Sequence, residues 1–91
     1  IRKEQAELRK KASPLRKQAD KYEKKVQHWQ IELAAVEGFL AESEIYQSEH
    51  KSRLATLIKQ QASLKADIEE NEMHWLEIEE KIEDIMSQVS I

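Results

Sequence analysis

Apolar residues recur along the first half of the chain at alternating intervals of four and three. This series is Leu8, Ala12, Leu15, Ala19, Tyr22, Val26, Trp29, Leu33, Val36 and Leu40. The spacing averages 3.5 residues, which is the heptad repeat and places these side chains on one narrow side of a helix. Such a seam is normally buried against another helix, so the pattern predicts a long helix with a helical partner.

The second half of the chain carries the same alternation. Its series is Leu54, Leu57, Gln61, Leu64, Ile68, Asn71, Trp75, Ile78, Ile82, Ile85 and Val89. Gln61 and Asn71 are polar residues within the seam. Polar residues at such positions usually fix the register of a coiled coil at some cost in stability, and we favour this role over a ligand site.

A Ser13-Pro14 pair interrupts the first repeat. Proline inside a helix removes a hydrogen bond and its ring crowds the preceding turn, whereas Ser at the N-cap followed by Pro suits a helix start. We therefore predict a short N-terminal helix or linker over 1–13 and a long helix over about 14–42. The heptad phase continues through Pro14, so a kink in a continuous helix is the alternative.

Residues 43–48 are predicted to connect the two helices, with Ser48 as the N-cap of a helix over about 49–88. Ile45 and Tyr46 are apolar for a connector, and we expect them to plug the end of the coil. The predicted fold is therefore all-α: an antiparallel two-helix coiled-coil hairpin over 14–91, preceded by the short N-terminal helix.

Two registers of the hairpin bury both seams. The first pairs Leu33 with Leu57 and Leu15 with Trp75, and the second pairs Leu33 with Leu64. The first register places Arg16 near Glu72, Arg9 near Glu79, Glu23 near Lys65 and Lys25 near Asp67, whereas the second opposes Glu23 to Glu72 and Glu32 to Asp67. Each exposed pair contributes about 0.2–1 kcal/mol, and their sum favours the first. Trp29 and Trp75 are expected to be buried in the seam.

The composition argues against a self-contained enzyme. A chain of 91 residues encloses a small core, and one glycine leaves little for a phosphate-binding loop. There is no cysteine, no apolar run of the roughly 20 residues that span a membrane, and no signal peptide. Because the chain starts at Ile1 rather than Met, we expect a piece of a longer protein. We expect that protein to be cytoplasmic.

Charge is distributed unevenly along the chain. Residues 1–28 carry ten Lys/Arg and four Asp/Glu, whereas residues 29–91 carry five and fourteen. The basic side chains recur every seven residues on the outer face of the first helix, an arrangement that can follow a phosphate backbone. The candidate nucleic-acid-binding residues, here called the basic stripe, are Arg2, Lys3, Arg9, Lys10, Lys11, Arg16, Lys17 and Lys24. The alternative is a solvated face partly neutralised by the acidic last helix.

Other chemistry finds little support in the residues. His28, His50 and His74 are too far apart in the sequence for a metal site, and we expect no metal and no cofactor in this domain. The acidic residues Glu69, Glu70, Glu72, Glu77, Glu79, Glu80, Glu83 and Asp84 are expected on an open helix surface, where nothing raises a carboxyl pKa for acid–base catalysis. No aromatic residue lies within the basic stripe to stack on bases, so we expect no sequence-specific recognition.

Three short segments resemble the C-terminal domain of ABC-F proteins, the ATP-binding cassette ATPases that do not transport. They are Ser13-Pro14-Leu15-Arg16-Lys17, Leu40-Ala41-Glu42-Ser43-Glu44-Ile45-Tyr46 and Glu72-Met73-His74-Trp75-Leu76-Glu77. The resemblance covers nearly the whole chain and is closest to the YheS-type branch, with the Uup type more distant. It implies a parent with two ATP-binding domains that acts on ribosomes, with this domain as a helical appendage thought to contact nucleic acid.

These observations lead to two main hypotheses. In the first, the hairpin is an accessory domain that helps an ABC-F ATPase engage ribosomal RNA or other nucleic acid, with no catalytic residue of its own and with ATP bound by the parent's other domains. In the second, the hairpin is a structural spacer or protein–protein arm. The family's ATP-binding motifs have no counterpart in these residues.

Overall fold

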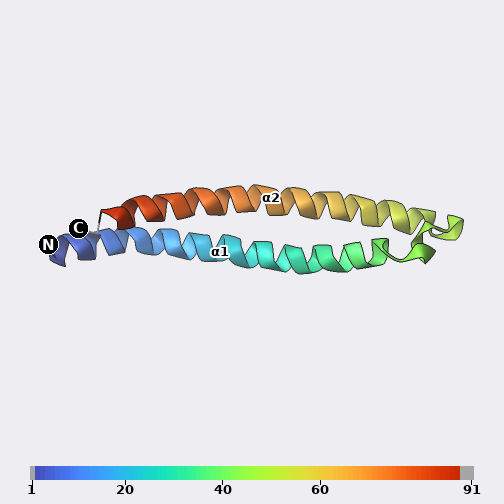
Figure 1. The fold of residues 1–91 in the computed structure, drawn as a ribbon, viewed down its shortest axis with the longest axis horizontal. Coiled ribbons are helices and arrows are strands. Elements are labelled where there is room, and N and C mark those ends of the chain that lie inside the picture. The colour runs from blue at the N-terminus through green and yellow to red at the C-terminus, as the bar shows by residue number, and fades with distance from the viewer. Residues whose placement is uncertain (1, 89–91) are drawn as a thin grey trace. The chain divides into compact units, whose positions relative to one another are not determined.

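The computed structural model describes residues 2–88, and all regular structure within that range is helical. Its elements are α1 (Arg2–Leu40), the 3₁₀ turns η1 (Ser43–Tyr46) and η2 (Ser48–His50), and α2 (Lys51–Ser87) (Figure 1). The chain forms two compact units. Unit 1 joins the part of α1 up to Lys25 to the part of α2 from Asn71, and unit 2 comprises Val26–Glu70.

The heptad pattern correctly predicted an all-α helical hairpin and the residues of its seam. All ten seam residues of α1 are buried or half-buried, and so are those of α2 as far as Ile85. The most enclosed are Ala12, Ala19 and Val26 on α1 and Leu57 and Ile78 on α2, none more than 7% exposed. Val89 lies outside the described residues.

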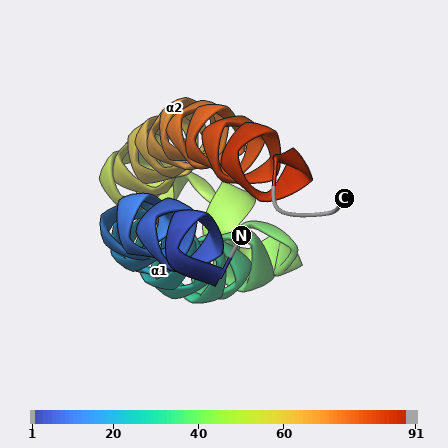
Figure 2. The same ribbon diagram turned by 90° about the vertical axis from the view of Figure 1, so that its left-hand side faces the viewer.

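In unit 1 the beginning of α1 lies beside the end of α2, and the two run in opposite directions (Figures 1 and 2). The most enclosed residues on the α1 side of this core are two alanines, of which Ala12 is fully buried and Ala19 is 5% exposed. The Tyr22 and His74 rings stack with centroids 5.7 Å apart and planes at 27°. Trp75 Nε1 donates a hydrogen bond of 3.2 Å to Glu79 Oε1 one turn later.

Unit 2 contains the hairpin bend. Tyr46 Oη donates a 2.7 Å hydrogen bond to the Leu40 carbonyl, which satisfies one of the acceptors that a helix leaves unpaired at its C-terminus. Ile45 is 7% exposed and is buried at the end of the coil as predicted. Tyr46 is 60% exposed, so its ring is not buried there, and its contribution is the hydrogen bond from its hydroxyl to the end of α1.

The predicted break at Ser13-Pro14 is wrong. Over the described part of 1–13, residues 2–13, there is no separate helix, because α1 runs without interruption from Arg2 to Leu40 with Pro14 inside it, as the alternative of a continuous helix had it. Proline in a helix interior costs about 3 kcal/mol, and seam packing on both sides of it offsets that cost. Ala12 is fully buried and Leu15 half-buried, and a break would remove one of them from the seam.

The predicted helix ends near the connector also need correction. The first helix ends at Leu40, before residue 42, and the second begins at Lys51, after residue 49. Ser48 is the first residue of η2 and does not cap α2, while Gln47 occupies the N-cap of that turn without a side-chain hydrogen bond. The connection between the helices therefore contains two 3₁₀ turns and is longer than the predicted link of six residues.

The predicted register is also wrong. It opposes Tyr22 to Ile68, but in unit 1 Tyr22 stacks on His74, about 9 Å further along α2 at 1.5 Å per residue. In unit 2, Val36 and Leu64 line the same cavity, although the prediction opposes Val36 to Leu54. Both observations fit the alternative in which Leu33 faces Leu64.

The connector supplies a physical reason for this register. In unit 2 the first turns of α2 extend past the end of α1, and the 3₁₀ turns bridge the offset (Figure 1). Closing the bend in this way buries Ile45. The exposed ion pairs that favoured the other register contribute too little each to compete with apolar burial.

The seam encloses its tryptophans and polar residues less fully than predicted. Trp29 and Trp75 are half-buried rather than buried, and Gln61 and Asn71 are half-buried too. Two helices cannot surround an indole on every side, so one edge of each ring meets water. No buried side-chain N or O atom among residues 2–88 lacks a hydrogen-bond partner.

Candidate nucleic-acid interface

The basic stripe lies on α1 within unit 1, and every one of its eight residues is exposed. Lys3, Lys10, Lys17 and Lys24 are spaced by seven residues, or about 10.5 Å along the helix. They occupy the outermost heptad position, opposite the seam of α1. All eight predicted residues therefore face solvent on one segment of α1, with the four lysines in a row on its outer face. Lys21, which is exposed on the same part of α1, was left out of the predicted set although its charge lies within the same segment.

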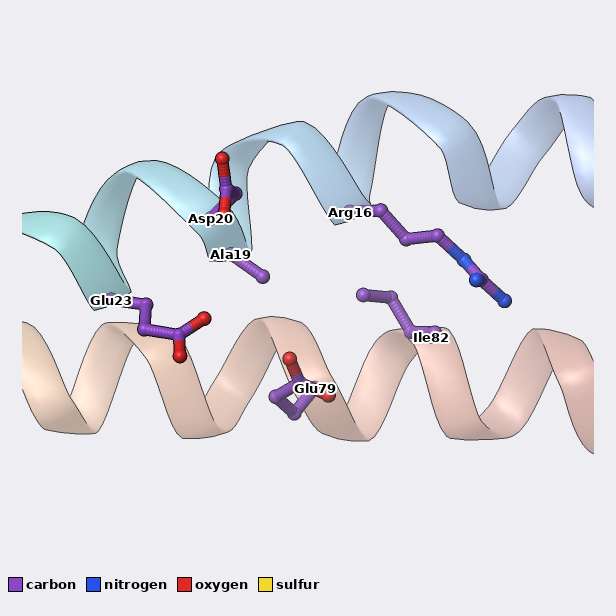
Figure 3. Close-up of a pocket in the computed structure, with 6 residues that line it drawn as sticks. All are labelled: Arg16, Ala19, Asp20, Glu23, Glu79 and Ile82. Carbon is purple, nitrogen blue, oxygen red and sulfur yellow. The ribbon is translucent and has the colours of Figure 1, made fainter.

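Two arginines of the stripe, Arg9 and Arg16, line cavities beside α2. Arg16 lines a shallow cavity of about 340 Å³ together with Ala19, Asp20, Glu23, Glu79 and Ile82 (Figure 3). A second cavity of about 300 Å³ is lined by Arg9, Ser13, Arg16 and Met86. Arg9 and Arg16 therefore border the groove between the two helical segments of unit 1, where Glu79 is a carboxylate neighbour of Arg16.

Lys24 differs from the other lysines because it has a carboxylate partner. Its Nζ lies 3.1 Å from Asp20 Oδ2 one turn earlier, and the two side chains are 74% and 58% exposed. Exposed helix pairs of this kind contribute a few tenths of a kcal/mol, so a phosphate could displace Asp20. Lys3, Lys10 and Lys17 are nonetheless the stronger candidates.

Unit 1 separates its charges between its two helical segments. The described α1 segment, 2–25, carries ten Lys/Arg and four Asp/Glu, whereas the α2 segment, 71–88, carries one lysine and six Asp/Glu. These net charges of +6 and −5 nearly cancel at a distance. At physiological ionic strength charges interact over about 8 Å, so an anion close to α1 still meets a positive surface.

This surface suits phosphate contacts and lacks the groups that read bases. Arginine and lysine at regular spacing neutralise phosphates without regard to sequence. The aromatic ring nearest in sequence to the stripe is Tyr22, which is half-buried and stacked on His74. The structure thus offers electrostatic attraction on α1 without a stacking platform beside it.

The three histidines each lie beside a glutamate of the same helical stretch. His28 Nε2 is 3.2 Å from Glu32, His50 Nε2 is 3.8 Å from Glu49 and His74 Nδ1 is 4.0 Å from Glu77. Within residues 2–88 no group of three His, Cys, Asp or Glu side chains could hold a metal ion. In the same range neither helix has the length and apolarity to cross a membrane.

Comparison with known proteins finds similarity to YheS proteins of several Escherichia coli strains. Over 53 residues the chain is 42% identical to the "Probable ATP-binding protein YheS" of Escherichia coli K12, and the same holds for strains O157:H7 and CFT073. This chain is similar to YheS. The matched segment covers 58% of this chain and 8% of YheS, so the similarity is local.

The YheS match agrees, over 53 residues, with the resemblance to ABC-F proteins given by the three short segments of the sequence. No protein-family model matches the sequence, and no solved structure matches it. The YheS proteins are described by name as probable ATP-binding proteins.

Proposed function

We propose that this chain is an accessory helical domain of an ABC-F-type ATP-binding protein and that its basic stripe contacts RNA phosphates. The local identity to YheS supports the first part. The second part rests on one observation, the recurrence of exposed lysines every seven residues on the outer face of α1 in unit 1. ATP would be bound and hydrolysed by other domains of the parent, and this domain would contribute no catalytic residue.

The family resemblance supplies the setting of the proposal. ABC-F proteins are expected to act on ribosomes during translation, which implies a cytoplasmic protein with ribosomal RNA as the phosphate-bearing partner. Contacts through lysine and arginine alone would hold the RNA without reading its sequence. The domain would therefore add affinity and orientation to a parent whose target is set elsewhere.

The test compares two triple variants with the same change in net charge. Lys3→Glu, Lys10→Glu and Lys17→Glu reverse the outer row of the stripe, while Lys51→Glu, Lys59→Glu and Lys65→Glu reverse three exposed lysines of unit 2. Binding of a duplex RNA and of a single-stranded RNA is followed by fluorescence anisotropy between about 50 and 200 mM salt.

The stripe variant should bind both RNAs more weakly. Its slope of log affinity against log salt should shrink by about 0.7–0.9 for each phosphate that the variant no longer neutralises. The unit 2 variant should keep the wild-type slope. If RNA affinity fell equally in both variants, the net charge of the chain would explain the binding and the position of the lysines would not. Absence of RNA binding by the wild-type chain at low salt would leave the alternative, a spacer or protein–protein arm.

A further inference from the structure

One stretch of α1 in unit 2 carries apolar residues on its outer face as well as on its seam. Between positions 31 and 40 the charged residues are Glu32 and Glu37, and the others are Ile31, Leu33, Ala34, Ala35, Val36, Gly38, Phe39 and Leu40. A surface helix normally carries one apolar stripe, and a helix that is apolar all round is normally buried. This stretch therefore has more apolar surface than one partner helix covers.

The hairpin uses one side of the stretch. Leu33, Val36 and Leu40 are half-buried in the seam of unit 2, whereas Ala34 and Ala35 on the opposite side are exposed. Ile31 is 71% exposed and Phe39 is 41% exposed. The outermost heptad position, which holds lysine four times in unit 1, holds Ile31 and Gly38 here.

Gly38 has no role inside the hairpin. A Cβ built on it meets no atom within 4 Å, and its φ is not positive. Glycine is less favourable than alanine inside a helix, so no feature of the described hairpin accounts for a glycine at this position. With Ala35 three positions earlier, it leaves a flat strip on which another backbone can approach closely.

A groove borders the same strip. It has a volume of about 430 Å³ and is lined by Glu32, Ala35, Val36, Gln60, Ser63 and Leu64. Ala35 and Ser63 are small, so the apolar side chains of Val36 and Leu64 remain reachable between the helices. Ile31, Ala35 and Gly38 follow one another at intervals of four and three, which is the spacing that a docked helix presents.

We propose that this outer face of α1 binds an amphipathic partner helix whose apolar stripe is bordered by lysine or arginine. The face supplies the apolar strip Ile31, Ala35 and Gly38, and the exposed Glu32 and Glu37 border it. No Lys or Arg lies between positions 26 and 50. The nearest cation given for this stretch is Arg53 of α2, which lies over the Phe39 ring at 5.1 Å from its centroid, so the strip Ile31, Ala35 and Gly38 has carboxylates rather than cations of its own helix beside it. An antiparallel copy centred on Ala34 and Ala35 would set Glu32 against the Glu37 of its partner, so charge disfavours a second copy.

The probe is a synthetic helical peptide of about five turns, roughly 18 residues, with leucines at intervals of four and three bordered by lysine. A matched peptide carries glutamate in place of each lysine. Binding to the 91-residue chain is measured by isothermal titration calorimetry. The lysine peptide should bind, and the glutamate peptide should bind at least about tenfold more weakly because it meets Glu32 and Glu37.

Two variants test whether the peptide binds to this face of α1. Ala35→Glu and Gly38→Gln each put a larger side chain on an exposed helix position, so far-UV circular dichroism should not change, and each should weaken peptide binding at least about tenfold. Ile58→Ser removes an apolar side chain that is 50% exposed on α2 and should leave binding unchanged. Glu80→Gln with Glu83→Gln, which removes charge from unit 1, should leave it unchanged as well.

Three results would overturn the proposal. If the two peptides bound equally well, Glu32 and Glu37 would not select the lysine peptide. If the variant with Glu80→Gln and Glu83→Gln bound the lysine peptide more weakly, the attraction would come from the net charge of the chain and not from this face. Sedimentation of the chain alone as a dimer that Ala35→Glu dissociates would make a second copy the occupant. RNA binding in Gly38→Gln, which changes no charge, reports separately on the basic stripe, so the two proposals fail independently.

Discussion

Heptad position determines what an alanine does in this molecule. Ala12 is on the seam of unit 1 and has no exposed surface, whereas Ala6 on the same helix is exposed. The residue type is the same and the difference is the direction in which the Cβ points. Small side chains on the seam let the two helical segments approach closely, which suits the narrow α1 side of this core.

Enlarging Ala12 tests this close approach. Ala12→Leu adds three carbons where there is no free space, and overpacking of this kind typically costs about 1–3 kcal/mol. The free energy of unfolding in urea should fall by that amount. Ala6→Leu is the matched control and should change stability by less than about 0.5 kcal/mol, because surface substitutions rarely do more. An equal response of the two variants would contradict a tight seam at Ala12.

At the scale of elements, packing of the seam keeps α1 continuous although the Ser13-Pro14 pair favours a helix boundary. The Ser13-Pro14 pair is a favourable helix start by its chemistry, yet α1 continues through it. Local preference is worth a few kcal/mol at one position, whereas a broken helix could not keep the seam residues on both sides of Pro14 packed against α2. The helix therefore carries a proline that weakens it.

Replacing that proline should stabilise the protein. In a continuous helix Pro14→Ala restores a backbone hydrogen bond to the Lys10 carbonyl and removes the ring clash, a gain of up to about 3 kcal/mol. Urea unfolding should show a higher midpoint with unchanged slope. If Pro14 started a helix instead, the same substitution would be neutral or destabilising.

The register between α1 and α2 is the second property that belongs to this scale. Leu33 should face Leu64 in unit 2, so a Leu33→Cys, Leu64→Cys variant should form a disulfide under mild oxidation, because the two Cα atoms come within reach of a bridge. The pair Leu33→Cys, Leu57→Cys should not, since one heptad separates the positions by about 10 Å. Mobility on non-reducing gels with thiol titration distinguishes them, and preferential oxidation of the second pair would restore the register favoured by surface charge.

At the scale of the whole molecule, the separation of charge along the sequence governs how the chain meets a polyanion. The formal net charge of −3 would repel RNA, and attraction depends on the concentration of lysine and arginine in α1 of unit 1. The acidic α2 segment of that unit opposes it. The affinity for RNA therefore depends on two opposing effects: attraction by the basic α1 segment that the RNA contacts, and repulsion by the acidic α2 segment of the same unit.

Neutralising the acidic segment should shift this balance. Glu80→Gln with Glu83→Gln removes two negative charges from exposed positions of α2 without touching the stripe. RNA affinity at low salt should rise several-fold, and the gain should shrink as salt screens it. Glu32→Gln with Glu37→Gln makes the same change in unit 2 and should have a smaller effect. If both variants gain equally, net charge explains the binding and its location on α1 does not.

Much of the fold could be predicted from periodicity, because a seam residue is defined by spacing along one helix. Every described seam position proved buried or half-buried. The basic stripe could be placed on one face for the same reason, and its exposure follows from its distance from the seam. The pairing of Lys24 with Asp20 was also within reach of sequence reasoning, since residues four apart are neighbours on a helix.

The sequence by itself determined the helical class, the seam and the face that carries the lysines, because each depends on interactions within a few turns of one helix. Tertiary structure alone decided which seam residue of α2 meets which of α1, whether Pro14 ends a helix, and how deeply Trp29 and Trp75 are enclosed. Those outcomes depend on the competition between distant segments for burial. Two registers with the same local pattern differ by the fit of the bend and of the small side chains on the seam, and that fit exists only once both helices are in place.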